Sequence, residues 1–333
     1  MTVAAPVDER SPVVELSRAE ANSVARTAEG LCAAGHERVD SEGFVRLARE
    51  VWEDMPRQLR RTMREFRRDS GRHGALIFRG LPVGAGALPP TPNARGSVQS
   101  TVTVSAAVLL LMAHGLGDPA AFREEKSGAL VQDVVPVPGQ EEIQGNPGSV
   151  LLSFHIESAF HEHRPDYVSL LCLRSDQEGV AGLRTVCVRQ VLSALSDESR
   201  ETLFRAEFQT APPASFALDG DQAPVHAVLS GAPHDPDLRV DLASTTPRTS
   251  AAAAALLELG ELFDSTAETF HLIPGDLAVV DNRVAAHGRT AFRPRYDGQD
   301  RWLQRTFVMS DLRRSRDHRP HDGYVLHSGD EGA

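Results

Sequence analysis

The hydrophobic pattern divides the chain into a helical beginning and a later part made of short apolar runs. Between about residues 17 and 68, apolar positions recur every three or four residues, which is the spacing of one helix face. Ser17 is followed three residues later by Glu20, the capping-box pattern found at the start of a helix. A second helix is expected at 41–52. We therefore expect residues 1–70 to be mainly helical.

Beyond residue 128 the pattern changes to short apolar runs separated by Gly, Pro and Asp, which is typical of strands joined by turns. The expected strands are 130–135, 149–157, 167–174, 183–188, 224–229, 238–242, 276–281 and 301–310. Helices are expected between them at 191–208 and 251–263. Many short strands of this kind predict a sandwich or jelly roll. The expected fold class is α+β, with a mainly β jelly-roll core at 128–315 and flanking helices.

The length suits one large domain or two modest ones, and we expect a single domain over residues 1–333. The chain contains no internal repeat. A short buried strand is expected at 75–79 and an apolar helix at 102–115. Residues 209–223 are long and irregular enough to form a lid loop. The polar tail after Arg316 is expected to be loosely ordered.

Composition and charge narrow the class of protein. The net charge of −11 argues against a nucleic-acid partner, because phosphates recruit Lys and Arg, and the arginine-rich run 57–68 is interpreted as a solvated helix face. No apolar run reaches the ~18 residues that span a bilayer, so no membrane association is expected. The three cysteines (Cys32, Cys172 and Cys187) contain no CxxC pair and suit a reducing cytoplasm. No obligate protein partner is evident.

Candidate metal ligands stand at the end of one apolar run and just after another. His155 and Glu157 differ by two positions, and residues i and i+2 of a strand point to the same face. His287 follows the apolar run 276–281 and must return to the same place in space. Two imidazoles and one carboxylate are a known ligand set for non-haem Fe(II), and they leave coordination positions open for chemistry.

Two arginines indicate the cosubstrate. A three-ligand Fe(II) site needs an electron source to activate O2, and 2-oxoglutarate chelates the metal while its far carboxylate needs a buried cationic partner. Arg301 offers the bidentate guanidinium pairing that suits this carboxylate. Arg305 is four residues on, so it faces the same side of a strand at a distance of ~13 Å. One arginine can hold the cosubstrate and the other a second carboxylate.

Other interpretations of these residues stay open at this level. The chain has 13 His, so an isolated His-x-Glu is weak evidence, and two surface arginines on an edge strand are the plain alternative for Arg301 and Arg305. His161 and His163 lie in a polar turn and are not expected to bind metal. A zinc hydrolase with two His and one Glu is a further possibility. So is a non-catalytic jelly-roll protein that binds a metal or a small molecule.

Five stretches of the chain form a recognisable set of motifs: 128–136 (GALVQDVVP), 155–161 (HIESAFH), 167–174 (YVSLLCLR), 281–289 (DNRVAAHGR) and 294–305 (PRYDGQDRWLQR). Together they resemble the clavaminate synthase-like branch of Fe(II)/2-oxoglutarate oxygenases. Within that branch the chain is similar to the asparagine oxygenases of lipopeptide antibiotic pathways. The resemblance extends over nearly the whole chain and its combined motifs are highly specific.

The resemblance implies a double-stranded β-helix fold and hydroxylation of free L-asparagine at Cβ, for nonribosomal peptide antibiotic assembly, with arginine or glutamine as alternative amino acids. It also implies the roles of individual residues. His155, Glu157 and His287 match the iron ligands. Arg301 and Thr185 match the residues that bind the distal carboxylate of 2-oxoglutarate. The residues that match the substrate site are Arg305 for the α-carboxylate, Glu125, Gln132 and Asn146 around it, and Asp241 for the side chain.

The implied role of Asp241 has a physical basis. An ionised carboxylate only accepts hydrogen bonds, so it would favour the NH2 group of asparagine and repel the carboxylate of aspartate. A surface Asp in a turn is the alternative interpretation of this residue. Ile156 and Ser158 depart from the polar residues common in relatives, and strand alternation points both away from the metal side. We expect them to affect packing or substrate fit and not iron binding.

Overall fold

The helical first part packs on one side of the molecule. The computed structural model describes residues 11–216 and 223–327. The first three helices are α1 (Arg18–Ala33), α2 (Glu42–Trp52) and α3 (Arg57–Arg68). The capping box is confirmed, because Ser17 Oγ accepts from the Glu20 amide at 3.3 Å and the Glu20 carboxylate accepts from the Ser17 amide at 2.9 Å. Helix α3 buries only apolar side chains and leaves its arginines outside, as expected for a solvated face.

The larger of two central sheets has eight strands among the described residues. Its strands, in spatial order, are β1 (Val13–Glu15), β2 (Ala75–Arg79), β14 (Leu277–Asp281), β6 (Tyr167–Arg174), β16 (Trp302–Met309), β3 (Asp118–Phe122) and β17 (Val325–Leu326), with β4 (Gln132–Val134) also paired to β16. Most pairs are antiparallel; β1 pairs with β2, and β17 with β3, in parallel. The sheet therefore also recruits strands that precede residue 128.

The smaller central sheet has four strands and carries most of the polar chemistry. Its order is β13 (Glu268–Phe270), β7 (Leu183–Cys187), β15 (Ala285–Arg289) and β5 (Leu152–His155). Gly288 lets β5 approach β15, because a Cβ there would lie 2.5 Å from the carbonyl oxygen of Leu152. Small outlying sheets pair β10 (Leu229–Ala232) with β11 (Asp235–Leu238), and join β12 (Thr245–Pro247), β8 (Phe208–Thr210) and β9 (Val225–His226).

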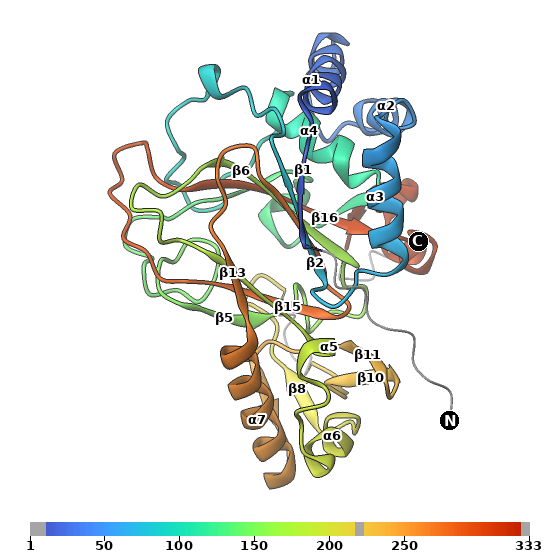
Figure 1. Ribbon diagram of the computed structural model, residues 1–333, viewed down its shortest axis with the longest axis vertical. Helices are drawn as coiled ribbons and strands as arrows, with labels where there is room; N and C mark the ends of the chain where they lie inside the picture. Colours follow the sequence, from blue (N-terminus) through green and yellow to red (C-terminus); the bar gives the residue numbers. More distant parts are fainter. Residues whose placement is uncertain (1–10, 217–222, 328–333) are drawn as a thin grey trace.

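The two central sheets face each other with helices on their outer sides (Figure 1). The apolar helix α4 (Val104–Ala113) is buried along its whole length and packs with α1, α2 and α3 against the larger sheet. The long helix α7 (Ser250–Thr266) packs with α5 (Val188–Val191) and α6 (Asp197–Leu203) beneath the smaller sheet. A third apolar cluster, including Leu183 and Leu303, fills part of the space between the sheets. The site occupies the rest of that space.

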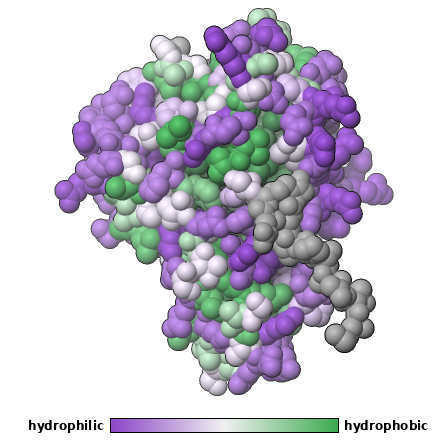
Figure 2. All heavy atoms as spheres, in the orientation of Figure 1, coloured by the Kyte–Doolittle hydropathy of each residue, from purple (hydrophilic) through white to green (hydrophobic). Residues whose placement is uncertain are grey.

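The outer surface seen in Figure 2 is mostly hydrophilic, with small groups of hydrophobic residues between polar ones. In the part of the chain that the structure describes, every helix is too short or too polar to cross a membrane. The three cysteines are free thiols, which agrees with the absence of a disulfide framework in the sequence.

Several sequence-based boundaries are wrong. Within the helix expected at 191–208 the structure has only α6 (Asp197–Leu203), because α5 ends at Val191 and strand β8 begins at Phe208. Ser196 caps α6, and its amide donates to the Glu258 carboxylate at 2.7 Å. The strand expected at 149–157 ends at His155, since the Ile156 amide bonds to the Val240 carbonyl at 2.9 Å instead of to β15. Strand β15 itself was not expected from the sequence. Its short Ala-Ala-His-Gly-Arg run lacks the β-branched and aromatic residues that mark strands.

The two segments expected to be irregular also differ from the prediction. The tail after Arg316 continues in η3 (Arg313–His318) and η4 (Pro320–Asp322), and then β17 pairs with β3, so it is ordered as far as residue 327. The expected lid at 209–223 begins in strand β8, and 211–216 is a loop. Residues 217–222 lie outside the described residues.

Candidate active site

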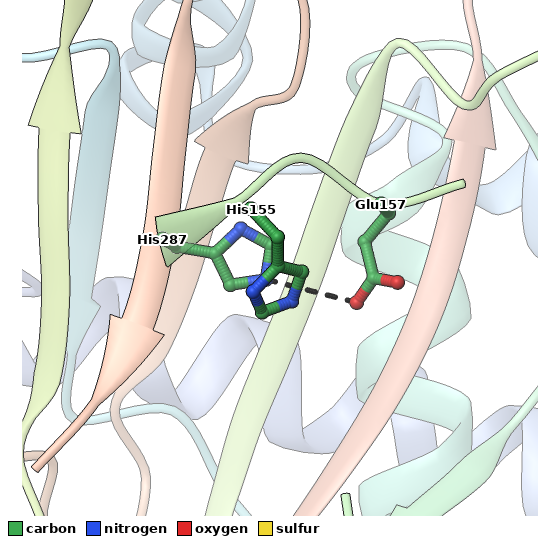
Figure 3. A group of neighbouring side chains, drawn as sticks. All are labelled: His155, Glu157 and His287. Atoms are coloured by element: carbon green, nitrogen blue, oxygen red, sulfur yellow. Dashed lines mark ion pairs between the residues drawn. The ribbon is translucent and has the colours of Figure 1, made fainter. Parts of the chain in front are cut away.

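Three side chains from the smaller sheet converge between the two sheets. His155 ends β5 and His287 lies opposite it on β15, with ring centroids 4.5 Å apart. Glu157 follows β5, and its Oε1 is 3.6 Å from His287 Nε2 (Figure 3). The possible ligand atoms of the three residues all lie within 4.8 Å of one another, as in one metal site. The structure therefore brings the three predicted ligands together.

A backbone carbonyl and the side-chain amide of Asn282 orient these ligands. The carbonyl oxygen of Ser153 is 2.9 Å from His155 Nδ1, so a proton on Nδ1 leaves Nε2 free to bind a metal. The side chain of Asn282 bonds to both the backbone amide and the backbone carbonyl of Glu157. Asn282 Oδ1 accepts from the Glu157 amide at 2.7 Å, and Nδ2 donates to the carbonyl oxygens of Glu157 at 3.1 Å and Pro165 at 2.9 Å.

Arg305 of β16 reaches across from the opposite sheet and forms the centre of a polar network. Its Nη1 donates to Glu157 Oε1 at 2.6 Å, and its Nη2 donates to Glu125 and to Gln132 Oε1. The side-chain amide of Asn146 lies 3.2 Å from both Nη atoms and accepts from them when its oxygen faces the guanidinium. One buried cation is thus surrounded by two carboxylates and two amides.

Electrostatics keeps these groups in the protonation states that a metal site requires. Burial would raise the pKa of Glu157, but Arg305 and the two histidines outweigh it and hold the pKa well below the usual range. Burial, together with His155, lowers the pKa of His287, which favours the neutral imidazole that binds metals. Burial opposes the charge of Arg305, yet Glu125 and Glu157 raise its pKa overall.

Two further predicted site residues, Thr185 and Arg301, are buried outside the Arg305 network. Thr185 of β7 is buried and pairs directly with His287 in the β7–β15 register. Arg301 precedes β16, where a register shift between Trp302 and Leu303 interrupts the regular alternation assumed for Arg301 and Arg305. Burial lowers the pKa of Arg301, and the nearby Cys172 and Asp176 oppose this only in part.

Arg289 was not singled out from the sequence and lies beside Arg301. The guanidinium carbons of Arg289 and Arg301 are 5.1 and 6.0 Å from the centroid of the same ring, that of Phe292. Burial, and then the charge of Arg301, lowers the pKa of Arg289 to about 9. The motif His-Gly-Arg was visible in the sequence, but only the unexpected strand β15 places Arg289 on the same side as His287.

A cavity of about 670 Å³ opens beside the three possible ligands. Its wall includes His155, Glu157 and Arg305, and also Glu125, Asn146, Asp241 and residues of the 211–216 loop. Gln132 and Thr185 are buried outside this wall. Asp241 is bridged through its backbone to His155, while its carboxylate accepts from the Ala243 amide at 2.9 Å and the Ser244 hydroxyl at 2.7 Å.

Ile156 and Ser158, on either side of Glu157, both line the cavity, although strand alternation predicted that they point away from the metal side. Ile156 is 2% exposed and packs in the apolar cluster beneath the smaller sheet. Ser158 has a φ of 54°, a left-handed conformation that turns the chain directly after Glu157. The turn places His161 edge-on against Phe122, at a centroid distance of 4.9 Å. The rings of His163 and His318 are tilted at 54° to each other, with centroids 4.8 Å apart.

The residues present fit an Fe(II) centre and an anionic cosubstrate. Two imidazoles and one carboxylate converge with one side open to the cavity, which suits a metal that must also bind small molecules. Arg301 is buried, yet among the described residues its guanidinium has no carboxylate within ion-pair distance. A buried cation without a counter-ion is costly, so an anionic ligand would complete the site.

Comparison with known proteins places the chain in a family. The model of the taurine catabolism dioxygenase TauD, TfdA family matches residues 48–307. The chain belongs to this family of dioxygenases, as its facing sheets and its His, Glu and His group lead one to expect.

Individual relatives are similar over almost the full length. An L-asparagine oxygenase of Streptomyces coelicolor is 59% identical over 313 residues, which cover 94% of this chain and 94% of the relative. A crystal structure of asparagine oxygenase with Fe(II), 2S,3S-3-hydroxyasparagine and succinate has a TM-score of 0.93 at 58% identity, covering 96% of this chain and 100% of that one. The non-haem iron oxygenase OrfP, crystallised with iron and α-ketoglutaric acid, has a TM-score of 0.85 at 33% identity, covering 95% and 100%. The resemblance found in the sequence is confirmed.

Proposed function

We propose that this protein is an Fe(II)- and 2-oxoglutarate-dependent oxygenase that hydroxylates free L-asparagine at Cβ. The reaction converts L-asparagine, 2-oxoglutarate and O2 into 3-hydroxy-L-asparagine, succinate and CO2. One observation carries the proposal: His155, Glu157 and His287 converge beside Arg305 in a chain that is 59% identical to an L-asparagine oxygenase. Because a similar structure holds the 2S,3S product, we assign that stereochemistry here too.

His155, Glu157 and His287 would hold the iron, which supplies the activation of O2 when it is bound. The protein supplies binding, orientation and exclusion of water. Neutral imidazoles and an ionised carboxylate are the required donor forms, and the local charges favour both. Arg301, which is buried, and Thr185, which pairs with His287 in the β7–β15 register, would bind the distal carboxylate of 2-oxoglutarate.

The Arg305 network would bind the backbone groups of the amino acid. Arg305 offers its guanidinium to the α-carboxylate, while Gln132 and Asn146 fix the plane of the guanidinium from two sides. Glu125, already in contact with Arg305, can accept from the α-ammonium group. A substrate attached to a carrier as a thioester has no α-carboxylate, so this network favours the free amino acid.

Asp241 would select the side chain. It lines the same cavity as Arg305, and its carboxylate accepts hydrogen bonds when ionised. The amide NH2 of asparagine can donate to it, whereas the carboxylate of aspartate would be repelled. This contact would hold the substrate at its far end, so that Cβ lies between two fixed points.

The wider setting follows from these assignments. We assign the two facing sheets to a double-stranded β-helix of the cupin-like jelly-roll type, within one catalytic domain over residues 1–333. A role in nonribosomal peptide antibiotic assembly, a cytoplasmic location and the absence of nucleic-acid, membrane and obligate protein partners are parts of the same proposal. Free thiols suit a reducing compartment.

The direct test is mass spectrometry of the protein incubated with Fe(II), ascorbate, 2-oxoglutarate and L-asparagine. We expect an asparagine product heavier by one oxygen atom and an equal amount of succinate. Absence of this product while a known oxygenase is active in the same buffer would overturn the proposal. Omission of Fe(II), or addition of a chelator, should abolish both products.

A panel of free amino acids distinguishes the alternatives. Faster turnover of arginine or glutamine would keep the chemistry and change the substrate. A zinc hydrolase predicts bound zinc and no O2 consumption, and a non-catalytic binding protein predicts metal binding without succinate from any amino acid. Metal analysis combined with an oxygen electrode separates these outcomes.

A further inference from the structure

Arg289 is a buried cation that the proposed mechanism leaves without a role. It is 4% exposed, its Nε has no hydrogen-bond partner in the described part of the protein, and its Nη2 donates to the Val150 carbonyl at 3.1 Å. An isolated guanidinium held by one neutral acceptor is costly to bury. A residue in this state is expected to have a further ligand.

The place of Arg289 on β15 shows which face of the sheet such a ligand would contact. The β7–β15 register is unbroken from His287, opposite Thr185, to Arg289, opposite Leu183, and the register shift between these two residues occurs only in the pairing of β15 with β5. His287 and Arg289 are therefore two residues apart on one face of β15, the face turned toward the larger sheet. Arg289 is one pleat further along the strand from the metal group, on the side where Arg301 lies.

Arg289 and Arg301 form a pair of like charges. Both guanidinium groups lie against the Phe292 ring, at 5.1 and 6.0 Å from its centroid. Neither has an ion pair with any described residue, and the nearby carboxylate of Asp176 is already occupied by the amides of Val180 and Ala181. Two buried cations that share an aromatic ring and no counter-ion repel each other unless an anion lies between them.

We propose that Arg289 is a second cosubstrate-binding residue, which together with Arg301 holds the distal carboxylate of 2-oxoglutarate. This inference rests on the proposed function, because it assumes that Arg301 faces that carboxylate. Two guanidinium groups supply more donors than one bidentate pair needs, and each carboxylate oxygen can accept more than one hydrogen bond. The double positive charge would make the site selective for 2-oxo acids with a second carboxylate.

The experiment measures binding instead of turnover. The Fe(II)-loaded protein is titrated without oxygen by calorimetry with 2-oxoglutarate and, separately, with pyruvate, which keeps the chelating end and lacks the distal carboxylate. For Arg289→Met we expect about 10- to 100-fold weaker binding of 2-oxoglutarate, which corresponds to one lost charged hydrogen bond. Pyruvate affinity should stay the same. Arg289→Lys keeps the charge and should recover part of the loss.

The exposed Arg293 provides a matched control, and Arg293→Met should bind both ligands as the unmodified protein does. Unchanged 2-oxoglutarate affinity in Arg289→Met, or an equal loss for pyruvate, would show a structural role and overturn the assignment. A protein that prefers 2-oxoglutarate over pyruvate, loses that preference in Arg301→Met and keeps it in Arg289→Met would retain the proposed function and refute only this inference. If the unmodified protein shows no such preference, the proposed cosubstrate itself is wrong.

Discussion

Arg305 and Glu157 are joined by a hydrogen bond of 2.6 Å although they come from opposite sheets. Arg305 lies on β16 of the larger sheet, and Glu157 follows β5 of the smaller one. The contact links the proposed substrate-binding arginine directly to a proposed iron ligand. Binding of an amino acid at Arg305 would therefore change the surroundings of the metal at the same time. Such a link suits an enzyme whose metal should activate O2 only when the substrate is present.

Replacement of Arg305 by Met should destabilise the metal-free protein by about 3–5 kcal/mol, because Glu157 and Glu125 lose their buried counter-ion. In the unmodified protein the pKa of Glu157 is lowered, so its contribution to stability is lost progressively as the pH falls from the ordinary carboxylate range to well below it. In the variant, burial would raise that pKa, so the deficit should shrink as the pH falls. Denaturant unfolding at several pH values measures both effects.

Arg305→Lys is the control for charge. It should restore most of the stability but not the bidentate pairing with an α-carboxylate, so KM for L-asparagine should still rise by about tenfold or more. If both variants unfold like the unmodified protein at neutral pH, the ion pair does not contribute as argued.

Asn282 should act as a positioning residue for the metal group. Asn282→Ala removes the acceptor for the Glu157 amide and the donors to the carbonyl oxygens of Glu157 and Pro165. Loss of such outer contacts typically weakens metal binding about 10- to 100-fold. Fluorescence-monitored titration of the apoprotein with Fe(II) under anaerobic conditions tests this. The exposed Asn93 offers a matched Asn→Ala control, which should leave the affinity unchanged. Equal affinities in the two variants would remove Asn282 from the proposed metal site.

The local sequence predicted the elements that have strong periodicity or clear caps. Strands 75–79 and 167–174 agree with the structure at both ends, and the helix at Ser17 begins at its capping box. Strand β15 was missed because its five residues are mostly small, and it is a strand only because β5 and β7 flank it. The pairing of β15 with β5 joins residues about 130 positions apart in the sequence, and a local sequence pattern does not predict such a contact.

The site shows the same division between local and long-range information. The spacing of His155 and Glu157 predicted convergence correctly, although Glu157 lies beyond the strand that was expected to carry it. Asn282 and Arg289 act through their places in space, and neither residue type nor spacing distinguished them in the sequence. Their signals are a hydrogen-bond triplet and an unpaired buried charge, which exist only in the folded chain.

Stability of the apoprotein should fall as the pH decreases from about 6.5. Burial lowers the pKa of His114, His161 and His226 to about 4 each. Between pH values of about 6.5 and about 4, these histidines bind protons in the unfolded chain but not in the folded one. The free energy of unfolding therefore decreases as the pH falls. Each histidine contributes a slope of up to about 1.4 kcal/mol per pH unit. Urea unfolding across this range measures the total slope.

A single substitution assigns part of that slope. His114→Leu should reduce the pH dependence of the unfolding free energy by nearly one proton, because burial is the main cause of the lowered pKa of His114. The exposed His234 gives the matched control, since His234→Gln should leave the slope unchanged. A slope that is the same in His114→Leu and the unmodified protein would contradict the assignment.

Ile156 should contribute to packing and not to metal binding. Its side chain is buried in the cluster beneath the smaller sheet, although it stands between His155 and Glu157. Ile156→Val should cost about 0.5–1.5 kcal/mol of stability and leave one iron bound per chain. Thermal unfolding and metal analysis of the purified variant measure the two quantities. A variant that folds normally but binds no iron would show that the residue supports the metal directly.

Asp241→Asn should relax the discrimination between asparagine and aspartate. The native carboxylate accepts from the Ala243 amide and the Ser244 hydroxyl and can accept further hydrogen bonds, and Asp241 lines the same cavity as Arg305. An amide at this position can donate to the carboxylate of aspartate, which the native Asp241 would repel. The ratio of kcat/KM for the two amino acids should therefore shift by about 10- to 100-fold toward aspartate, the value of one charged hydrogen bond. Asp54→Asn, a change at an exposed position, should leave the ratio unaltered. An unchanged ratio in Asp241→Asn, in a variant that still binds iron, would mean that another group in the cavity recognises the side chain.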